Sequence, residues 1–475
     1  MRLGHAATRF GVPPVAAGAV GAAVFTGLLV AVRPEAGLVL VVAGAFAALA
    51  MRDLPLAVAL WIPTIFIEGI PGSRLAPEAV GSLVGIAWVA ALRQGRLRPS
   101  LDRSRPMLLA VGAMLVFFTS SLAWAEDTGA AAGYVWYFYE TAVFLLFVVT
   151  AAQRPEDLRR LVGAFVAGAV LSVVIGFGAV AAGLPGFEED GRLMGGAGDA
   201  NYFAAALVPA IALAAGLMLT SPVRRSRLLS GLAILPLVAG VAASQSRGGL
   251  LACGAMAVIA FVVLRDLRRA VVGAALTILL IGGLYYAANP GAMTRVTEDK
   301  YGGSGREDLW RIGVNVAGDH PLLGVGAGNF GVVSVRYTQT SGPLSYGKGI
   351  LRGQEPHNVY LGLLAELGAV GLLLYLLVPL VSLWSSLTAA RTFDRLGRKD
   401  LATIARTCFV ALIGAMATSI FLPNATDKRA WVLMALGPAV YCIAREMTTS
   451  AWRHAAPAPA ATRRRAGNPI PLPSR

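Results

Sequence analysis

Hydrophobic residues along this chain are gathered in long runs rather than scattered. Apolar stretches of about 17–25 residues recur over most of its length, which is what crossing a hydrocarbon core of roughly 30 Å requires. Lipid offers backbone groups no hydrogen-bond partners, so only helices and closed barrels can span it. The runs lack the alternation of apolar and polar positions that barrel strands show. The pattern predicts an all-α, polytopic transmembrane helical bundle of about 12–14 spans.

The boundaries of the runs give the expected spans. Arg52 and Asp53 separate two of them so closely that one of the two could be re-entrant. The spans are expected near residues 12–32, 36–51, 54–70, 77–92, 106–125, 132–152, 161–183, 200–220, 228–243, 249–264, 270–288, 357–385, 402–422 and 430–445.

The longest polar segment, residues 289–356, lies between two spans and is far longer than a turn needs to be. It is expected to be one large extracytoplasmic loop containing short helices. Within it, Leu309, Ile312 and Val316 recur at helical spacing, and this apolar face could lie along the membrane surface. Seven basic residues fall in the loop: Arg295, Lys300, Arg306, Arg311, Arg336, Lys348 and Arg352.

Composition and charge agree with a membrane protein. Hydrophobic residues make up 56% of the 475 residues and charged ones 14%, whereas soluble domains carry about 25% charged residues. With a cytoplasmic N-terminus, the inner segments hold 27 Lys/Arg and the outer segments 13, so the positive-inside bias places both termini in the cytoplasm. The net charge of +15 then reports topology and contact with membrane lipid. No basic soluble domain is present, which argues against a nucleic-acid partner.

Three parts are expected. Residues 1–183 would form N-terminal transmembrane helices, with the first span retained rather than removed as a signal peptide. Residues 184–445 would form a transmembrane core that includes the loop, and residues 446–475 a disordered, basic cytoplasmic tail. Cys253, Cys408 and Cys442 fall inside apolar runs without metal-like spacing, so they indicate neither a metal site nor a disulfide framework. No cofactor is predicted.

Arginines on the outer side oppose the charge bias and are candidates for function. Arg247, in "SQSRGGLLA", could snorkel at a helix end, or its guanidinium could bind phosphate at the membrane face. Arg192 could pair with a neighbouring acidic residue or contact substrate. Asp199 or Asn201 could cap the following span or contact substrate.

The loop adds an arginine at a helix start. Arg306 opens the segment "GREDLWRIGVNVAGD", where free backbone donors and the helix dipole favour an anion. The glycines of "GVGAGNF" do not follow a strand and are no nucleotide motif, but they predict a tight turn under a bound ligand.

His357 is the sharpest candidate. Its imidazole can act as a base near neutral pH, and it stands with Asn358 at the start of a long apolar helix. In a regular helix, Gly368 would return to the same face and Gly371 would lie close to it, forming a stripe along which a helix or a lipid tail could run. A capping or interfacial histidine is the alternative.

These residues lie in three motifs, "SRGGLLA", "GRxxLW…HPLLGVGxGNF" and "HN-x9-GxxG", whose order and spacing resemble the bacterial O-antigen ligase/O-antigen polymerase family of membrane glycosyltransferases. The resemblance implies transfer of a glycan from an undecaprenyl-diphosphate carrier to a glycan or lipid acceptor at the outer face of the cytoplasmic (inner) membrane, without metal. It implies that His357 is the catalytic residue and that Arg247, Arg306 and, less directly, Arg192 bind the diphosphate. Supporting positions would be Asn358, Gly368, Gly371, Trp310 and Asn329.

The acceptor distinguishes the functional alternatives. O-antigen ligation in surface polysaccharide or lipopolysaccharide biosynthesis is expected, and polymerisation of polysaccharide repeat units by the same chemistry is the alternative. A membrane transporter of the bicarbonate transporter type is a further reading, but a transporter should carry ionisable groups near mid-membrane. Here Glu140, Glu366 and Arg406 are the ionisable residues clearly inside spans.

Overall fold

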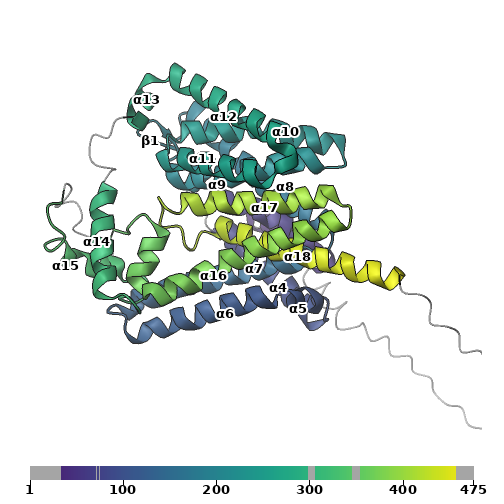
Figure 1. Cartoon of the computed structure of the whole chain (residues 1–475), viewed down its shortest axis with the longest axis horizontal. Coiled ribbons are helices and arrows are strands. Elements are labelled where there is room, and N and C mark those ends of the chain that lie inside the picture. Colours follow the sequence, from purple (N-terminus) through teal and green to yellow (C-terminus); the bar gives the residue numbers. More distant parts are fainter. Residues whose placement is uncertain (1–33, 71, 74, 298–304, 345–353, 456–475) are drawn as a thin grey trace, which may run out of the picture.

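A computed structural model describes residues 34–70, 72–73, 75–297, 305–344 and 354–455, and these form a helical bundle (Figure 1). Among these residues, nine helices are long and apolar enough to cross a membrane, and three shorter apolar helices accompany them. The prediction of an all-α, polytopic membrane bundle is confirmed. The expected first span, 12–32, lies outside the described residues.

The first half of the bundle consists of α2 (Pro34–Arg52), α3 (Leu54–Trp61), η1 (Ile62–Phe66), α4 (Leu75–Arg93), α5 (Arg98–Arg103), α6 (Arg105–Ser120), η2 (Ser121–Ala123), α7 (Thr128–Ala151) and α8 (Pro155–Ala181). The short strands β1 (Glu188–Glu189) and β2 (Arg192–Leu193) and the turn η3 (Gly195–Ala197) follow.

The second half consists of α9 (Ala200–Thr220), α10 (Arg224–Ala243), α11 (Arg247–Val263), η4 (Arg265–Leu267), α12 (Arg268–Ala288), α13 (Pro290–Thr297), α14 (Arg306–Asp319), α15 (Phe330–Tyr337), α16 (Val359–Arg395), α17 (Lys399–Thr418) and α18 (Lys428–Ala455). Here α9 has the predicted bounds, while α16 runs ten residues beyond its predicted end. α18 continues to Ala455, past the start of the predicted tail, whose residues 456–475 lie outside the described residues.

One hydrophobic core joins the predicted N-terminal part to the rest. Helix α6 packs on α16, α7 on α18 and α8 on α9, so the expected boundary at residue 183 is no break in packing. Helix α9 is almost entirely buried between its neighbours, whereas α12 has no buried residue. Four of its leucines, Leu276, Leu279, Leu280 and Leu284, are exposed. An exposed apolar helix surface of this kind belongs against lipid, so α12 forms a lipid-facing edge.

The loop is a small helical layer at one end of the bundle. Figure 1 shows α14 standing across the end of the bundle helices, beside α15. The apolar face of α14 packs with α15 and the start of α16 in a second core that contains Ile312, Val316, Phe330 and Ala365. The expectation that this face lies along the membrane surface is therefore wrong, because the protein itself buries it.

Helix α16 is broken near its start, which corrects the predicted glycine stripe. Gly368 has φ 64° and ψ −170°, inside an otherwise helical run. A Cβ at this position would lie 2.2 Å from the backbone of Leu322. Backbone of the loop fills the break, with Ala369 N donating to Pro321 O at 2.8 Å and Gly326 N donating to Glu366 O at 2.8 Å. Gly368 thus admits the chain that follows α14 and leaves no groove for a lipid tail there.

Candidate active site

The candidate arginines and His357 come from four separate segments and gather at one end of the bundle. The charges of Arg192, Asp199 and Arg247 influence the pKa of Arg306. The charges of Arg306 and Asp199 influence the pKa of His357. We call Arg192, Arg247 and Arg306 the arginine cluster. The structure therefore brings together the four residues that the sequence singled out.

A hairpin positions Arg192. Strands β1 and β2 are joined by Asp190 and Gly191, both with positive φ, as a two-residue turn of this sequence favours. Gln245 Nε2 donates to Gly191 O at 2.6 Å and fixes the hairpin to the α10–α11 connection.

The guanidinium of Arg192 lies over the first turn of α9. Its Nε donates to Ser244 O at 3.0 Å and its Nη2 to Asn201 Oδ1 at 2.8 Å. The expected pairing with a neighbouring acidic residue is not the contact formed. Burial lowers the pKa of Arg192 from its ordinary value, which is the behaviour of a cation that has lost water without gaining a close carboxylate.

Arg247 is the first residue of α11. Ser246 caps the helix by accepting from Gly249 N at 3.2 Å, and Ser246 Oγ donates to Asn201 Oδ1 at 2.9 Å. Arg247 Nη2 donates to Arg295 O at 2.8 Å, linking α11 to α13. The two glycines after Arg247 leave room for the side chains of Phe421 and of Ala204 in α9. Asn201 consequently connects the segments that carry Arg192 and Arg247.

Arg306 opens α14, the helix that crosses the end of the bundle. Its N-cap, Gly305, has φ 80° and no side chain, so side-chain capping does not satisfy the first backbone donors. Burial first, and then the charge of Arg192, lower the pKa of Arg306. No described residue forms an ion pair with Arg306. Binding of an anion would relieve the repulsion between Arg192 and Arg306.

His357 precedes α16 with a left-handed backbone, φ 47°, a conformation uncommon outside glycine. The next residue, Asn358, is the N-cap and accepts from Tyr360 N and Leu361 N, both at 3.0 Å. Val359 N donates to Ser419 O at 3.0 Å. The helix start is therefore held on both sides, and the structural role of Asn358 is capping.

The environment of His357 favours a neutral ring. Burial and the charge of Arg306 lower the pKa of His357 below its ordinary value of 6.5, while Asp199 raises it. No described side chain hydrogen-bonds to the imidazole. A half-buried, neutral imidazole at pH 7 can accept a proton from a substrate hydroxyl.

Trp310 lies one helical turn beyond Arg306. Its indole Nε1 is buried, and no described residue accepts its hydrogen bond. The ring is 6.5 Å from that of Phe421, whose side chain also fills the space above Gly248. A buried donor without an acceptor is uncommon in folded proteins, so Trp310 is suited to bind an oxygen of a ligand.

The other supporting candidates have structural contacts. Asn329 is fully buried and exchanges hydrogen bonds with the backbone of Asp127, accepting from its N at 2.7 Å. A Cβ on Gly371 would meet Phe117 and Leu367. The glycine turn before Asn329, predicted to lie under a ligand, instead packs against α7 and α16.

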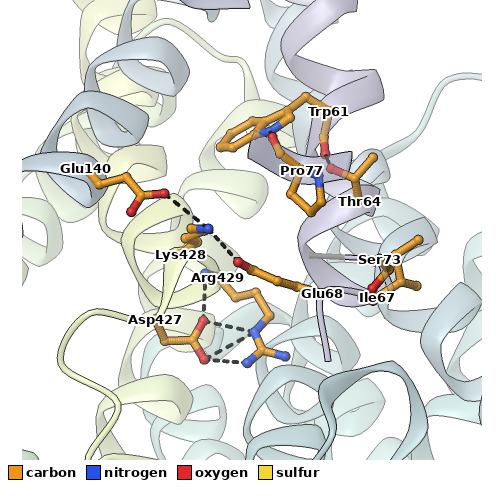
Figure 2. A network of polar contacts seen from close by, with 10 residues as sticks. All are labelled: Trp61, Thr64, Ile67, Glu68, Ser73, Pro77, Glu140, Asp427, Lys428 and Arg429. Atoms are coloured by element: carbon orange, nitrogen blue, oxygen red, sulfur yellow. Dashed lines mark hydrogen bonds and ion pairs between the residues drawn. The ribbon is translucent and has the colours of Figure 1, made fainter. Parts of the chain in front are cut away.

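Beside the arginine cluster the structure contains a cavity that sequence reasoning missed. Its volume is about 530 Å³, and Asp199 and Tyr202 on the first turn of α9 line it. Figure 2 shows Lys428 Nζ between Glu68 Oε1, at 2.6 Å, and Glu140 Oε1, at 3.2 Å. Arg429 forms a forked pair with Asp427 next to them. Three consecutive charged residues, Asp427, Lys428 and Arg429, precede the last predicted span, and this run is the sequence signal that could have indicated the cavity.

Among the described residues, no group of three or more His, Cys, Asp or Glu side chains is arranged to hold a metal ion. The metal independence of the chemistry stays a prediction.

Comparison with known proteins supports the resemblance seen in the motifs. Residues 232–376 match a family model described as O-Antigen ligase. The matched range runs from α10 into α16 and contains Arg247, Arg306 and His357, but neither Arg192 nor the residues that line the cavity. No curated protein matches the chain. Over these residues the match supports the predicted resemblance to the O-antigen ligase family, and it indicates an O-antigen ligase/polymerase-like, multi-pass membrane protein with a glycosyltransferase-like activity.

Proposed function

Starting from an O-antigen ligase match that contains Arg247, Arg306 and His357, we propose that this protein transfers a glycan from undecaprenyl diphosphate to an acceptor hydroxyl. The reaction takes place at the outer face of the cytoplasmic membrane, with both termini in the cytoplasm. The observation that carries the proposal is the gathering of three arginines and one histidine, whose pKa burial lowers, at a single end of the bundle.

The arginine cluster would bind the diphosphate of the donor. Diphosphate departs readily once its developing charge is matched, and guanidinium groups do this without a metal. The lowered pKa of Arg306, caused by burial and by Arg192, supports this role because a bound anion would restore the balance of charge. The buried indole N–H of Trp310 could donate to a donor oxygen.

His357 would act on the acceptor. The imidazole takes the proton of the acceptor hydroxyl as its oxygen attacks the anomeric carbon, and the bond from that carbon to the diphosphate oxygen breaks. The electron pair leaves with the diphosphate beside the arginines, so the configuration at carbon inverts. A base whose pKa lies below 6.5 is present in the required neutral form at pH 7.

The transporter reading is weakened by the contacts of the ionisable residues within spans. Arg406 pairs with Asp394, and Glu140 pairs with Lys428. Glu366 Oε1 accepts from Phe330 N at 3.2 Å and so holds the glycine turn on α16. Each of these groups has a structural partner, whereas a transport path needs groups that exchange partners.

Variants of the purified protein test the proposal. His357→Ala and Arg247→Ala are expected to insert normally but to lower glycan transfer from a lipid-linked donor by at least about a hundredfold. Arg311→Ala, on the exposed side of α14, is the matched control and should retain activity. Full activity of His357→Ala would remove the histidine from the mechanism.

Surface glycans of a deletion strain separate ligation from polymerisation. Loss of the capped acceptor, with chains of normal length left on the carrier, would indicate a ligase. Accumulation of single repeat units would indicate a polymerase.

A further inference from the structure

The cavity beside the arginine cluster has the opposite charge. Its carboxylates outnumber its cationic side chains, five to two. The carboxylates belong to Glu68, Glu78, Glu140, Asp199 and Asp427, and the cations to Lys428 and Arg429. Both cations are already paired within the cavity wall. An anionic ligand would meet uncompensated negative charge here, so the cavity does not suit a diphosphate.

We propose that this acidic cavity is the binding subsite for sugar residues of the acceptor, and that it takes uncharged or amine-bearing sugars and rejects phosphorylated or carboxylated ones. The proposal rests on the proposed glycan transfer and adds where the acceptor binds and which chemical class it belongs to.

A buried amide oxygen supports a ligand at this place independently of the acidic residues. Asn424 lines the cavity and is 5% exposed. Its Oδ1 is buried, and no described residue donates a hydrogen bond to it. A buried acceptor without a hydrogen bond destabilises the folded protein, and a ligand hydroxyl would satisfy it.

Size and lining also fit a sugar. At about 530 Å³, the cavity falls within the range of about 300–1,000 Å³ that is usual for small-molecule sites. Tyr137 and Tyr202 contribute aromatic rings to a wall that is otherwise rich in hydrogen-bonding groups. Carboxylates accept hydrogen bonds from hydroxyl and ammonium groups, and the ion pairs of Lys428 hold Glu68 and Glu140 in place.

The cavity adjoins the reacting centre through one helical turn. Asp199 lines the cavity and its charge also acts on Arg306 and His357. Asn201, two residues on, binds Arg192. A sugar in the cavity could therefore present a hydroxyl to His357 while the donor diphosphate occupies the arginines. In a displacement with inversion, the nucleophile must enter opposite the leaving group, and two adjoining subsites of opposite charge provide that arrangement.

Two probes applied to the purified, full-length protein test the proposal. The first is an array of immobilised bacterial glycans with neutral, amine-bearing, carboxylated and phosphorylated members. The second is inorganic pyrophosphate, whose binding reports the arginine cluster. The variants are Asn424→Leu and Glu140→Gln, with Glu126→Gln as the matched control, since Glu126 lies outside the cavity and pairs with Arg336.

The expected result is that wild-type protein binds neutral or amine-bearing glycans, and that both cavity variants lose about tenfold or more of this affinity. Their affinity for pyrophosphate and the glycan binding of Glu126→Gln should change less than about twofold. Asn424→Leu removes an oxygen that accepts no hydrogen bond from a described residue. If Asn424 had only a structural role, glycan binding should therefore be unchanged in this variant.

Other outcomes overturn the proposal. Binding confined to phosphorylated or carboxylated glycans, no glycan binding by the wild type, or glycan binding that survives in both variants would each do so. Two results would instead count against the proposed function: wild-type protein that does not bind pyrophosphate, or Arg247→Ala protein that binds pyrophosphate as well as the wild type does.

Discussion

The arginine cluster and the acidic cavity lie on either side of the first turn of α9, and they handle charge in opposite ways. In the cavity, Lys428 and Arg429 each have carboxylate partners within 3.2 Å. In the cluster, Arg192 donates to uncharged oxygens, and no described residue forms an ion pair with Arg306. The proposed mechanism uses this difference to sort substrates by charge, with the anionic donor beside the cluster and an uncharged or cationic acceptor in the cavity.

The two regions also differ in what supports them. Arg306 depends on α14, which is tied to the break in α16 by the chain from Pro321 to Gly326. The cavity is lined by η1, α4, α7, η3, α9, the α17–α18 connection and the start of α18, and by no described residue of the loop. Disturbing the loop should therefore affect one region and spare the other.

Gly368→Ala should have the largest effect, and it should affect the arginine cluster without the cavity. Its positive φ and the overlap of a Cβ with the Leu322 backbone are expected to cost about 2–5 kcal/mol locally. Pyrophosphate binding should be lost while glycan binding in the cavity remains. Gly178→Ala, whose added methyl group would meet nothing within 4 Å, is the control and should change neither. Simultaneous loss of both activities would show that the regions depend on each other.

Arg306→Gln removes one charge of the cluster, a guanidinium with which no described residue forms an ion pair. Transfer should fall about a hundredfold, corresponding to about 2.7 kcal/mol of transition-state stabilisation. Glycan binding in the cavity should not change. Arg311→Gln on the same helix, where Nη1 donates to Pro343 O at 2.8 Å, should leave turnover near wild type. Equal activity in the two variants would exclude Arg306 from donor binding.

Lys428→Gln acts on the cavity side. It leaves Glu68 and Glu140 facing each other without their cation and should destabilise the protein by about 1–3 kcal/mol. Thermal unfolding in detergent should show the loss, and Lys428→Arg should recover most of it. Pyrophosphate binding by the surviving folded protein should be unchanged, because the cluster contains no group that pairs with Lys428. An unchanged unfolding midpoint would contradict the assigned ion pairs.

The smallest effect expected is on the titration of His357. Because burial and the charge of Arg306 both lower the pKa of His357, Arg306→Gln should raise that pKa, although burial keeps it from returning fully to 6.5. The acid limb of the residual activity should move to higher pH, since protonation removes the base. The chain has four histidines, so NMR of histidine-labelled protein can follow His357 directly, assigned with His357→Gln. A pKa that stays the same in Arg306→Gln would mean that the two groups do not sense each other.

The sequence was most informative about features that depend on neighbouring residues alone, such as the length of a span or the cap of a helix. Alternation of long apolar runs and basic segments gave α9 its bounds, because lipid admits only helices of sufficient length. Arg247, Arg306 and His357 were found from their place in motifs and on the outer side. Asn358 follows the capping rule, with its side chain accepting from two backbone N–H groups.

Regular-helix reasoning failed at Gly368. An ideal helix would place Gly368 and Gly371 near the His357 face, but the helix is interrupted at Gly368 by a chain segment more than forty residues earlier. Glu366, which the sequence showed only as an ionisable residue inside a span, accepts a hydrogen bond from Phe330 N and fixes the glycine turn. Neither contact could be read from local spacing, because the partner segment approaches from the loop.

By itself, the sequence determined the class of protein and its helical bundle, and it supplied the candidate residues for diphosphate binding and proton acceptance. These follow from hydrophobic length, the sign of charge on each side and the chemistry of single side chains. Only the tertiary structure decided which charges have partners. Lys428 and Glu68 are 360 positions apart, and Asn424 lines the same cavity as Asp199 only once the bundle is packed. Electrostatic compensation depends on distance in space, so the acidic cavity beside the arginine cluster emerged only when the helices were assembled.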